Sequence, residues 1–111
     1  MPRRNMPDPY AQQVGARIRE LRLERNMSLA GLADASELSK GHLSSVEHGL
    51  AAITIGTIQR LARGFDLPPL YILAFAAEDE YSKIVELLRA LPVAEVKKVR
   101  RQLQAQAGKK R

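Results

Sequence analysis

The sequence contains no cysteine and no tryptophan, and only 5% of its 111 residues are aromatic. Without cysteine the chain cannot form a disulfide, a thiolate zinc site or a cysteine nucleophile. Its longest apolar run, from Leu67 to Ala77, is too short to cross a bilayer and holds two prolines near its start. Residues 1–10 have no apolar stretch of the kind that a secretory signal carries. These absences predict a cytoplasmic protein with no membrane partner.

Signatures of catalysis and of metal binding are missing as well. His42 and His48 are six residues apart on or near one short predicted helix, so they point to different faces and do not make a metal pair. The sequence has no nucleophile elbow and no glycine-rich phosphate loop. We therefore predict a protein that is not an enzyme and that uses no metal and no other cofactor.

Positive charge is concentrated toward the C-terminal end of the chain. The formal net charge is +6. Residues 9–76 carry seven basic and six acidic residues, whereas residues 77–111 carry nine basic and five acidic ones. A basic chain suits an anionic partner such as nucleic acid. A solvated tail that keeps the protein in solution explains the charge equally well, so charge alone leaves both interpretations open.

Helical periodicity dominates the sequence, and no segment alternates in the way a strand does. Apolar spacing predicts helices over residues 9–25, 29–35, 40–47 and 55–64, and a fifth helix begins at Asp66 or Leu67 with the prolines in its first turn. Three hydroxyl residues, Ser28, Ser39 and Thr54, are candidate N-caps of the second, third and fourth helices. Gly49 is placed to end the third helix.

Two more helices are predicted beyond Ala77, over residues 78–91 and 93–106, with Pro92 between them. Each carries an apolar stripe that we expect to face inward. The stripes consist of Tyr81, Ile84, Val85, Leu88 and Leu91 in the first helix and Val93, Val96, Val99 and Leu103 in the second. The expected fold is all-α: a five-helix domain over residues 9–77, a C-terminal helical hairpin over 78–107, and flexible ends at 1–8 and 108–111, where residues 107–111 fray.

The stretch SLAGLADASELSKGHLSSVEHG, residues 28–49, resembles the helix-turn-helix of the phage repressor/Cro family, or XRE-type regulators. The residues that carry the resemblance are Leu32 and Ala33, the turn at 36–38, Ser39–Lys40–Gly41, Leu43 with Val46, and Glu47 with Gly49. The family's residue pattern also extends into the segments on either side of the motif, IRELRLERNMS before it and TIGTIQRLARGFDLPPLYIL after it. The resemblance covers about two thirds of the chain and implies a five-helix, lambda-repressor-like domain.

This resemblance implies that the helix over residues 40–47 reads the major groove of double-stranded DNA. Leu43 and Val46 would anchor it to the core, leaving the small and polar residues near its start facing outward. The start of the next helix, around residues 54–57, is small enough to offer backbone N–H groups to a phosphate. The expected DNA-binding residues are Ser39, Lys40, Gly41, His42, Ser44, Ser45, Thr54 and Thr57.

The resemblance also implies a structural ion pair and reveals two departures from the family pattern. Arg22 and Glu47 occupy the positions of a pair that ties the first helix to the third. Glu37 stands where the turn usually has glycine, so it either adopts a left-handed conformation at a cost of about 1 kcal/mol or changes the turn. Leu29 replaces a glutamine that often contacts phosphate, which shifts affinity toward dimerisation or the tail.

A single helix-turn-helix buries too little surface for tight specific binding, so such domains usually dimerise on half-sites about one DNA turn apart. We expect a symmetric homodimer through the stripes of the two C-terminal helices, although these stripes could instead cover the domain's own core. The expected dimerisation residues are Ile84, Val85, Leu88, Leu91, Val96, Val99 and Leu103.

The sequence thus predicts a sequence-specific, dimeric DNA-binding transcriptional regulator from a bacterium or phage, with a repressor favoured and a regulatory protein partner as one source of its signal. The alternative is an antitoxin-like or adaptor protein whose C-terminal hairpin binds a partner protein. The basic face of the last helix could be solvated, contact the DNA backbone or bind an acidic partner. That face consists of Lys97, Lys98, Arg100 and Arg101.

Overall fold

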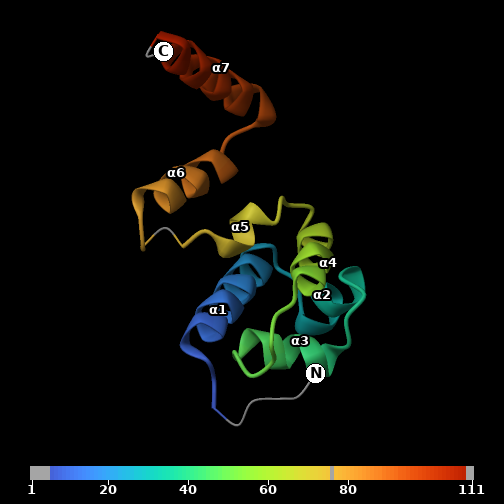
Figure 1. Cartoon of the computed structure of the whole chain (residues 1–111). Coiled ribbons are helices and arrows are strands. Elements are labelled where there is room, and N and C mark those ends of the chain that lie inside the picture. Colours follow the sequence, from blue (N-terminus) through green and yellow to red (C-terminus); the bar gives the residue numbers. More distant parts are fainter. Residues whose placement is uncertain (1–5, 76, 110–111) are drawn as a thin grey trace. The chain divides into compact units, whose positions relative to one another are not determined.

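The computed structural model describes residues 6–75 and 77–109, which contain seven helices and no strand (Figure 1). They fall into two compact units, Met1–Leu73 and Ala74–Arg111. The first unit contains α1 (Pro9–Glu24), α2 (Leu29–Ala35), α3 (Lys40–Glu47), α4 (Ile55–Phe65) and α5 (Leu70–Leu73). The second unit contains α6 (Glu80–Arg89) and α7 (Val93–Lys109). The predicted all-α fold class is confirmed.

The first four helices begin with the same local hydrogen bond. In each, the side chain of the N-cap residue accepts a bond from the backbone N–H three residues later, which would otherwise have no partner. The four N-caps are Asp8, Ser28, Ser39 and Thr54. Three of these caps are the hydroxyl residues predicted from sequence.

The same four helices also end alike. One or two positions after each helix end a residue has a left-handed backbone, and the N–H of the following residue bonds back to a carbonyl five positions earlier. This pattern is the Schellman motif, which satisfies carbonyls left free by the last turn. The left-handed residues are Asn26, Glu37, Asp66 and Gly49, with φ of 56°, 55°, 56° and 73°.

Glu37 is the most costly of these four left-handed residues. Glycine has no Cβ, and asparagine and aspartate visit this region more readily than longer side chains do. The turn between α2 and α3 therefore keeps its geometry at a cost in strain rather than changing its course. Arg60 Nη1 donates to the carbonyl oxygen of Glu37 at 3.1 Å, which fixes this turn to α4.

The core of the first unit lies where its helices meet, with α1 packed on α3 and α5, and α2 packed on α3 and α4. Ala33 is only 3% exposed, as expected for a small residue in the first motif helix. The largest side chains with no exposed surface are Ile18, Leu21, Leu32, Leu43, Leu61 and Ile72. One core thus serves all five helices of this unit.

Two glycines allow α1 and the end of α3 to pack backbone against backbone. A Cβ at Gly15 would lie 2.3 Å from the carbonyl oxygen of Val46, and a Cβ at Gly49 would lie 2.6 Å from the Cα of Gln12. Both distances are too short for any side chain. From the sequence, Gly49 was predicted only to end a helix, and Gly15 had no predicted role.

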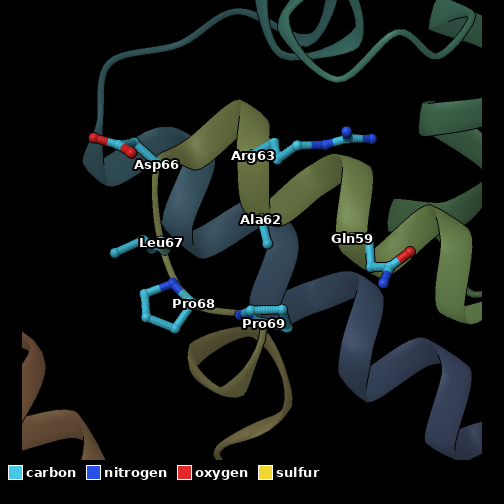
Figure 2. Close-up of a pocket in the computed structure, with 7 residues that line it drawn as sticks. All are labelled: Gln59, Ala62, Arg63, Asp66, Leu67, Pro68 and Pro69. Carbon is cyan, nitrogen blue, oxygen red and sulfur yellow. The ribbon is translucent and has the colours of Figure 1, made fainter.

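The turn from α4 into α5 differs from the prediction (Figure 2). α5 begins at Leu70, so Pro68 and Pro69 precede the helix instead of lying in its first turn. Their carbonyl oxygens accept bonds from the backbone N–H groups of Tyr71 and Ile72. α5 is consequently only four residues long.

α4 itself runs one residue further than predicted, through Phe65. Gly64 stays within the helix, where a Cβ would lie 2.3 Å from the Oγ of Ser36 on the neighbouring segment. The glycine therefore marks a close approach between α4 and the end of α2.

The second unit also differs from the prediction in its boundaries and its burial. α6 is shorter than expected, and α7 continues through Gly108 to Lys109, so residues 107–109 do not fray. The expected flexible ends at residues 1–5 and 110–111 lie outside the described residues, and Asp8 is held as the N-cap of α1. No residue of α6 or α7 is buried, and Tyr81, which was expected to face inward, is 84% exposed.

An open apolar groove runs along the second unit, with a volume of about 380 Å³. Leu88 of α6 lines it together with Val96, Val99 and Leu103 of α7. The predicted apolar stripes thus contribute to a concave surface only in part, through Leu88 of the first and three residues of the second. No helix in the described part of the chain is both long and apolar enough to span a bilayer.

The strain at Glu37 leads to a stability prediction. We expect Glu37→Gly to stabilise the protein by about 0.5–1 kcal/mol, because removing the Cβ clash outweighs the greater freedom of glycine in the unfolded chain. Urea unfolding of the full chain measures this difference. Glu37→Ala is the matched control: it removes the charge but keeps the Cβ, so an equal gain there would show that strain is not the cause.

Candidate nucleic-acid interface

α3 is seated on the core by one face and exposes the other near its start (Figure 1). Leu43 and Val46 have no exposed surface. Lys40 and Gly41 are exposed, and His42, Ser44 and Ser45 are half-buried in a continuous patch with the N-cap Ser39. Apolar residues three apart have therefore produced a helix whose outward face consists of small and polar side chains.

Gly41 lies within α3 but has no structural role that can be seen in the fold. A Cβ at this position would meet no atom within 4 Å. The fold would thus accept alanine here, and alanine is the stronger helix former by about 1 kcal/mol. A glycine that the fold does not need leaves the helix backbone open to close approach from outside.

The start of α4 is organised by its two threonines, although only one of them is exposed. Thr54 Oγ1 accepts a hydrogen bond from the backbone N–H of Thr57 at 3.1 Å, and the two hydroxyl oxygens are also 3.1 Å apart. Thr57 is 8% exposed, so its hydroxyl belongs to the cap and not to the surface. The exposed part of this helix start is Thr54, Ile55 and Gly56.

Arg22 joins α1 to the end of α3 and to the turn before α2. Its Nε and Nη2 donate to Glu47 Oε2 and Oε1 at 2.8 and 3.1 Å, and its Nη1 donates to the carbonyl oxygen of Met27 at 3.0 Å. The two side chains are 11% and 4% exposed. The structure thus brings together the two residues expected to pair, in the bidentate geometry that arginine and carboxylate favour.

The environment of Arg22 favours the charged form of its guanidinium. Its hydrogen bond to Glu47 raises the pKa of Arg22, burial acts in the opposite direction, and the charge of Glu47 adds to the rise. A raised pKa in the folded state means that the stabilisation is complete at every pH below the pKa of arginine in the unfolded chain, which lies far above neutral pH. The guanidinium is therefore fully charged under any physiological condition.

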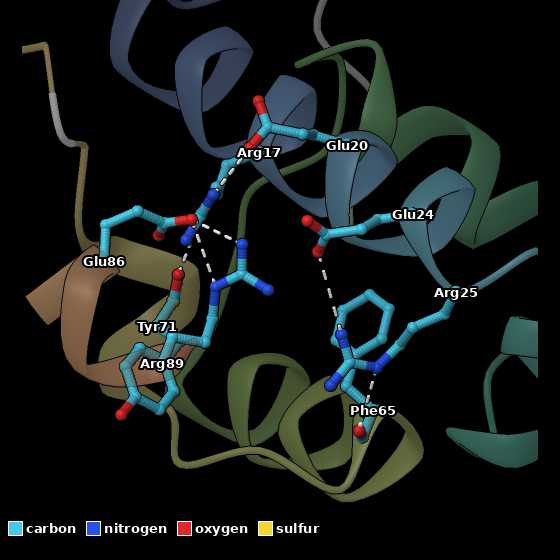
Figure 3. A network of polar contacts seen from close by, with 8 residues as sticks. All are labelled: Arg17, Glu20, Glu24, Arg25, Phe65, Tyr71, Glu86 and Arg89. Atoms are coloured by element: carbon cyan, nitrogen blue, oxygen red, sulfur yellow. Dashed lines mark hydrogen bonds and ion pairs between the residues drawn. The ribbon is translucent and has the colours of Figure 1, made fainter. Parts of the chain in front are cut away.

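Two more arginines of α1 are used inside the first unit (Figure 3). Arg17 is 8% exposed, and it donates to the carbonyl oxygen of Tyr71 at 2.9 Å and to Glu20 at 2.6 Å. Arg25 donates to the carbonyl oxygen of Phe65 at 3.2 Å and lies 5.7 Å from the centre of its ring. Neither arginine had a role predicted from the sequence, although Arg17 falls on the apolar face four residues before Leu21.

Comparison with known proteins supports the same class of fold and site. A helix-turn-helix family model matches residues 18–72. The transcriptional regulator RamB of Mycobacterium tuberculosis is 34% identical over 74 residues, which cover 67% of this chain and 15% of RamB. This chain therefore spans only a small part of that relative's length.

Two solved structures share the fold. The restriction-modification controller protein C.AhdI from Aeromonas hydrophila superposes with a TM-score of 0.55 at 31% identity, covering 56% of this chain and 94% of that one. The clp gene regulator ClgR from C. glutamicum gives a TM-score of 0.58 at 26% identity, covering 63% and 91%. The fold is that of a helix-turn-helix transcriptional regulator. The chain belongs to the XRE-type helix-turn-helix family.

The buried ion pair leads to a second prediction. We expect Glu47→Gln to destabilise the protein by about 3–5 kcal/mol, because it leaves the Arg22 charge buried without its partner. Arg22→Met should cost a similar amount, whereas the double variant should cost less than the sum of the two because no buried charge remains.

Thermal and urea unfolding of the three variants measure this coupling. The exposed pair of Glu95 and Lys98, 3.3 Å apart, is the control, and its removal should cost less than about 1 kcal/mol. Strictly additive costs for Arg22 and Glu47 would show that the pair is not coupled.

Proposed function

We propose that this protein is a sequence-specific regulator of transcription that binds double-stranded DNA with α3 in the major groove. The observation that carries the proposal is the contrast between the two faces of α3. Leu43 and Val46 are fully buried, while the opposite face near the helix start is small and polar, with Lys40 exposed and Ser44 and Ser45 half-buried. Helix-turn-helix docking places that part of the recognition helix against base edges.

Each exposed group has a chemical counterpart on DNA. Lys40 can donate to guanine O6 and N7 or to a phosphate, and the hydroxyls of Ser44 and Ser45 can contact either kind of base edge. Gly41 lets the helix backbone lie close to the groove. At the start of α4, Thr54 and the neighbouring backbone N–H groups suit a phosphate oxygen, because the N-terminal end of a helix attracts anions.

We also propose that the protein acts as a homodimer through residues 78–107, with residues 9–77 as the DNA-binding domain. The apolar groove of Leu88, Val96, Val99 and Leu103 has no cover within its own unit, and a second copy supplies a matching apolar face. A dimer would present two copies of α3 to half-sites about 34 Å apart. Repression is the simplest outcome, since it requires only that the bound protein occupy the promoter.

Gly41 provides a sharp test of groove binding. We expect Gly41→Ala to preserve or raise the stability of the free protein and to weaken its sequence-specific DNA affinity, because the added methyl group meets nothing until DNA is present. Lys40→Ala should weaken the preferred site by about 1–3 kcal/mol and relax the preference at one base pair. Fluorescence anisotropy on duplexes selected from random DNA measures both effects.

Gly108→Ala is the matched control, since this glycine also lies within a helix with no atom within 4 Å of the added Cβ. It should leave DNA affinity unchanged. If Gly41→Ala and Lys40→Ala bind the selected duplexes as tightly as the original chain, α3 does not read the groove.

The dimer is tested by placing a charge in the apolar groove. Leu103 is 57% exposed in the single chain, so Leu103→Glu should leave the first unit folded. The variant should become monomeric by light scattering, because the interface would bury an unpaired carboxylate. Gln102→Glu adds the same charge beside the groove residue and should remain dimeric. A Leu103→Glu protein that is still dimeric would place the interface elsewhere.

A further inference from the structure

The first unit uses much of its positive charge to hold its own fold. Residues 9–76 contain seven basic residues. Arg17, Arg22 and Arg25 donate hydrogen bonds inside the unit, and Arg60 donates to the carbonyl oxygen of Glu37. The exposed cations that remain are Arg19, Lys40 and Arg63. Lysine and arginine contacts to phosphates supply most of the salt-dependent affinity for DNA, so this unit can contribute only a few such contacts.

α7 has the opposite character. Four basic residues within five positions are exposed on it, and after Glu95 this helix contains no acidic residue. Like charges at three- and four-residue spacing destabilise a helix by a small amount, so the clustering is not explained by helix stability. The cluster, which we name the basic face, consists of Lys97, Lys98, Arg100 and Arg101.

Local partners leave most of the basic face unneutralised. Lys98 lies 3.3 Å from Glu95, and Arg100 donates only to the neutral Gln104. Within the described residues, Lys97 and Arg101 have no acidic partner. The basic face is therefore free to bind an anion.

The acidic residues of α6 do not supply that anion from a second copy. Asp79 accepts the N–H of Ser82 as the N-cap of α6. Glu80 pairs with Lys83 at 2.7 Å, and Glu86 pairs with Arg89 in the same helix. These acids are already engaged within their own helix, so the dimer that we propose would leave the basic face exposed.

We propose that the basic face of α7 binds the phosphate backbone of DNA and supplies a large share of the salt-dependent affinity. This inference rests on the proposed function. Of the basic face, only Arg100 lines the apolar groove, so a second copy in the groove leaves the other three cations able to contact DNA. DNA is favoured over a free acidic protein because a helix tethered to a DNA-bound domain meets the duplex at an effective concentration in the millimolar range.

The test compares two variants with the same change in net charge. Lys97→Gln/Arg101→Gln removes two cations of the basic face. Arg63→Gln/Lys83→Gln removes two exposed cations that lie outside α3, the start of α4 and α7. Affinity for a selected duplex and for a random duplex is measured over a range of NaCl concentrations, with light scattering to verify the oligomeric state.

Affinity falls as salt rises, so log affinity has a negative slope against log salt. We expect the basic-face variant to make this slope less steep on both duplexes, by about 0.9 for each phosphate that the substituted side chains no longer neutralise. The ratio of selected to random affinity should stay the same, and the control should keep the original slope. An unchanged slope in the basic-face variant would overturn the inference, as would an equal fall in the control. Failure to prefer any sequence would instead reject the proposed function, while the slope on random DNA would still test α7.

Discussion

The contact between α1 and the end of α3 determines how α3 is presented to its surroundings. At Gly15 and Gly49 the two backbones approach so closely that no side chain fits between them. The Arg22–Glu47 pair closes the same contact with two charge-assisted hydrogen bonds. A short helix of eight residues has little stability of its own, so its orientation depends on this support. Because these contacts hold the inward face of α3 against α1, they also determine which residues of α3 face outward.

Local capping complements that contact. Each of α1 to α4 is limited at both ends by its own hydrogen bonds, so local contacts as well as core packing determine where the helices begin and end. The turn of the motif keeps an unfavourable backbone conformation, the left-handed Glu37. Because Arg60 donates to the carbonyl of this residue, the strained turn is held by α4 as well as by its own Schellman hydrogen bonds.

Residues that act locally could be predicted from the sequence, and residues that act across the fold could not. Ser39 and Thr54 are recognisable as caps because capping depends on a residue three positions away. Gly15 has no such signal: its role depends on Val46, which is distant in sequence, and an ordinary helix pattern surrounds it. Thr57 was expected among the DNA-binding residues for the same reason, since its burial is decided by the cap of α4. Arg17, whose burial depends on α5, had no predicted role. Only the arginine–glutamate pair across α1 and α3 was anticipated, and that came from family resemblance.

The two units use their basic side chains differently. In the first unit, arginine side chains reach backbone carbonyls and buried carboxylates, which stabilises a small core of short helices. A guanidinium committed in this way cannot also neutralise phosphate. α7 has no core to stabilise and no buried residue, so its cations are not committed. From that difference we infer the proposed division, in which α3 supplies sequence discrimination and α7 supplies electrostatic affinity. It also explains how a nearly neutral helix-turn-helix unit can function within a strongly basic chain.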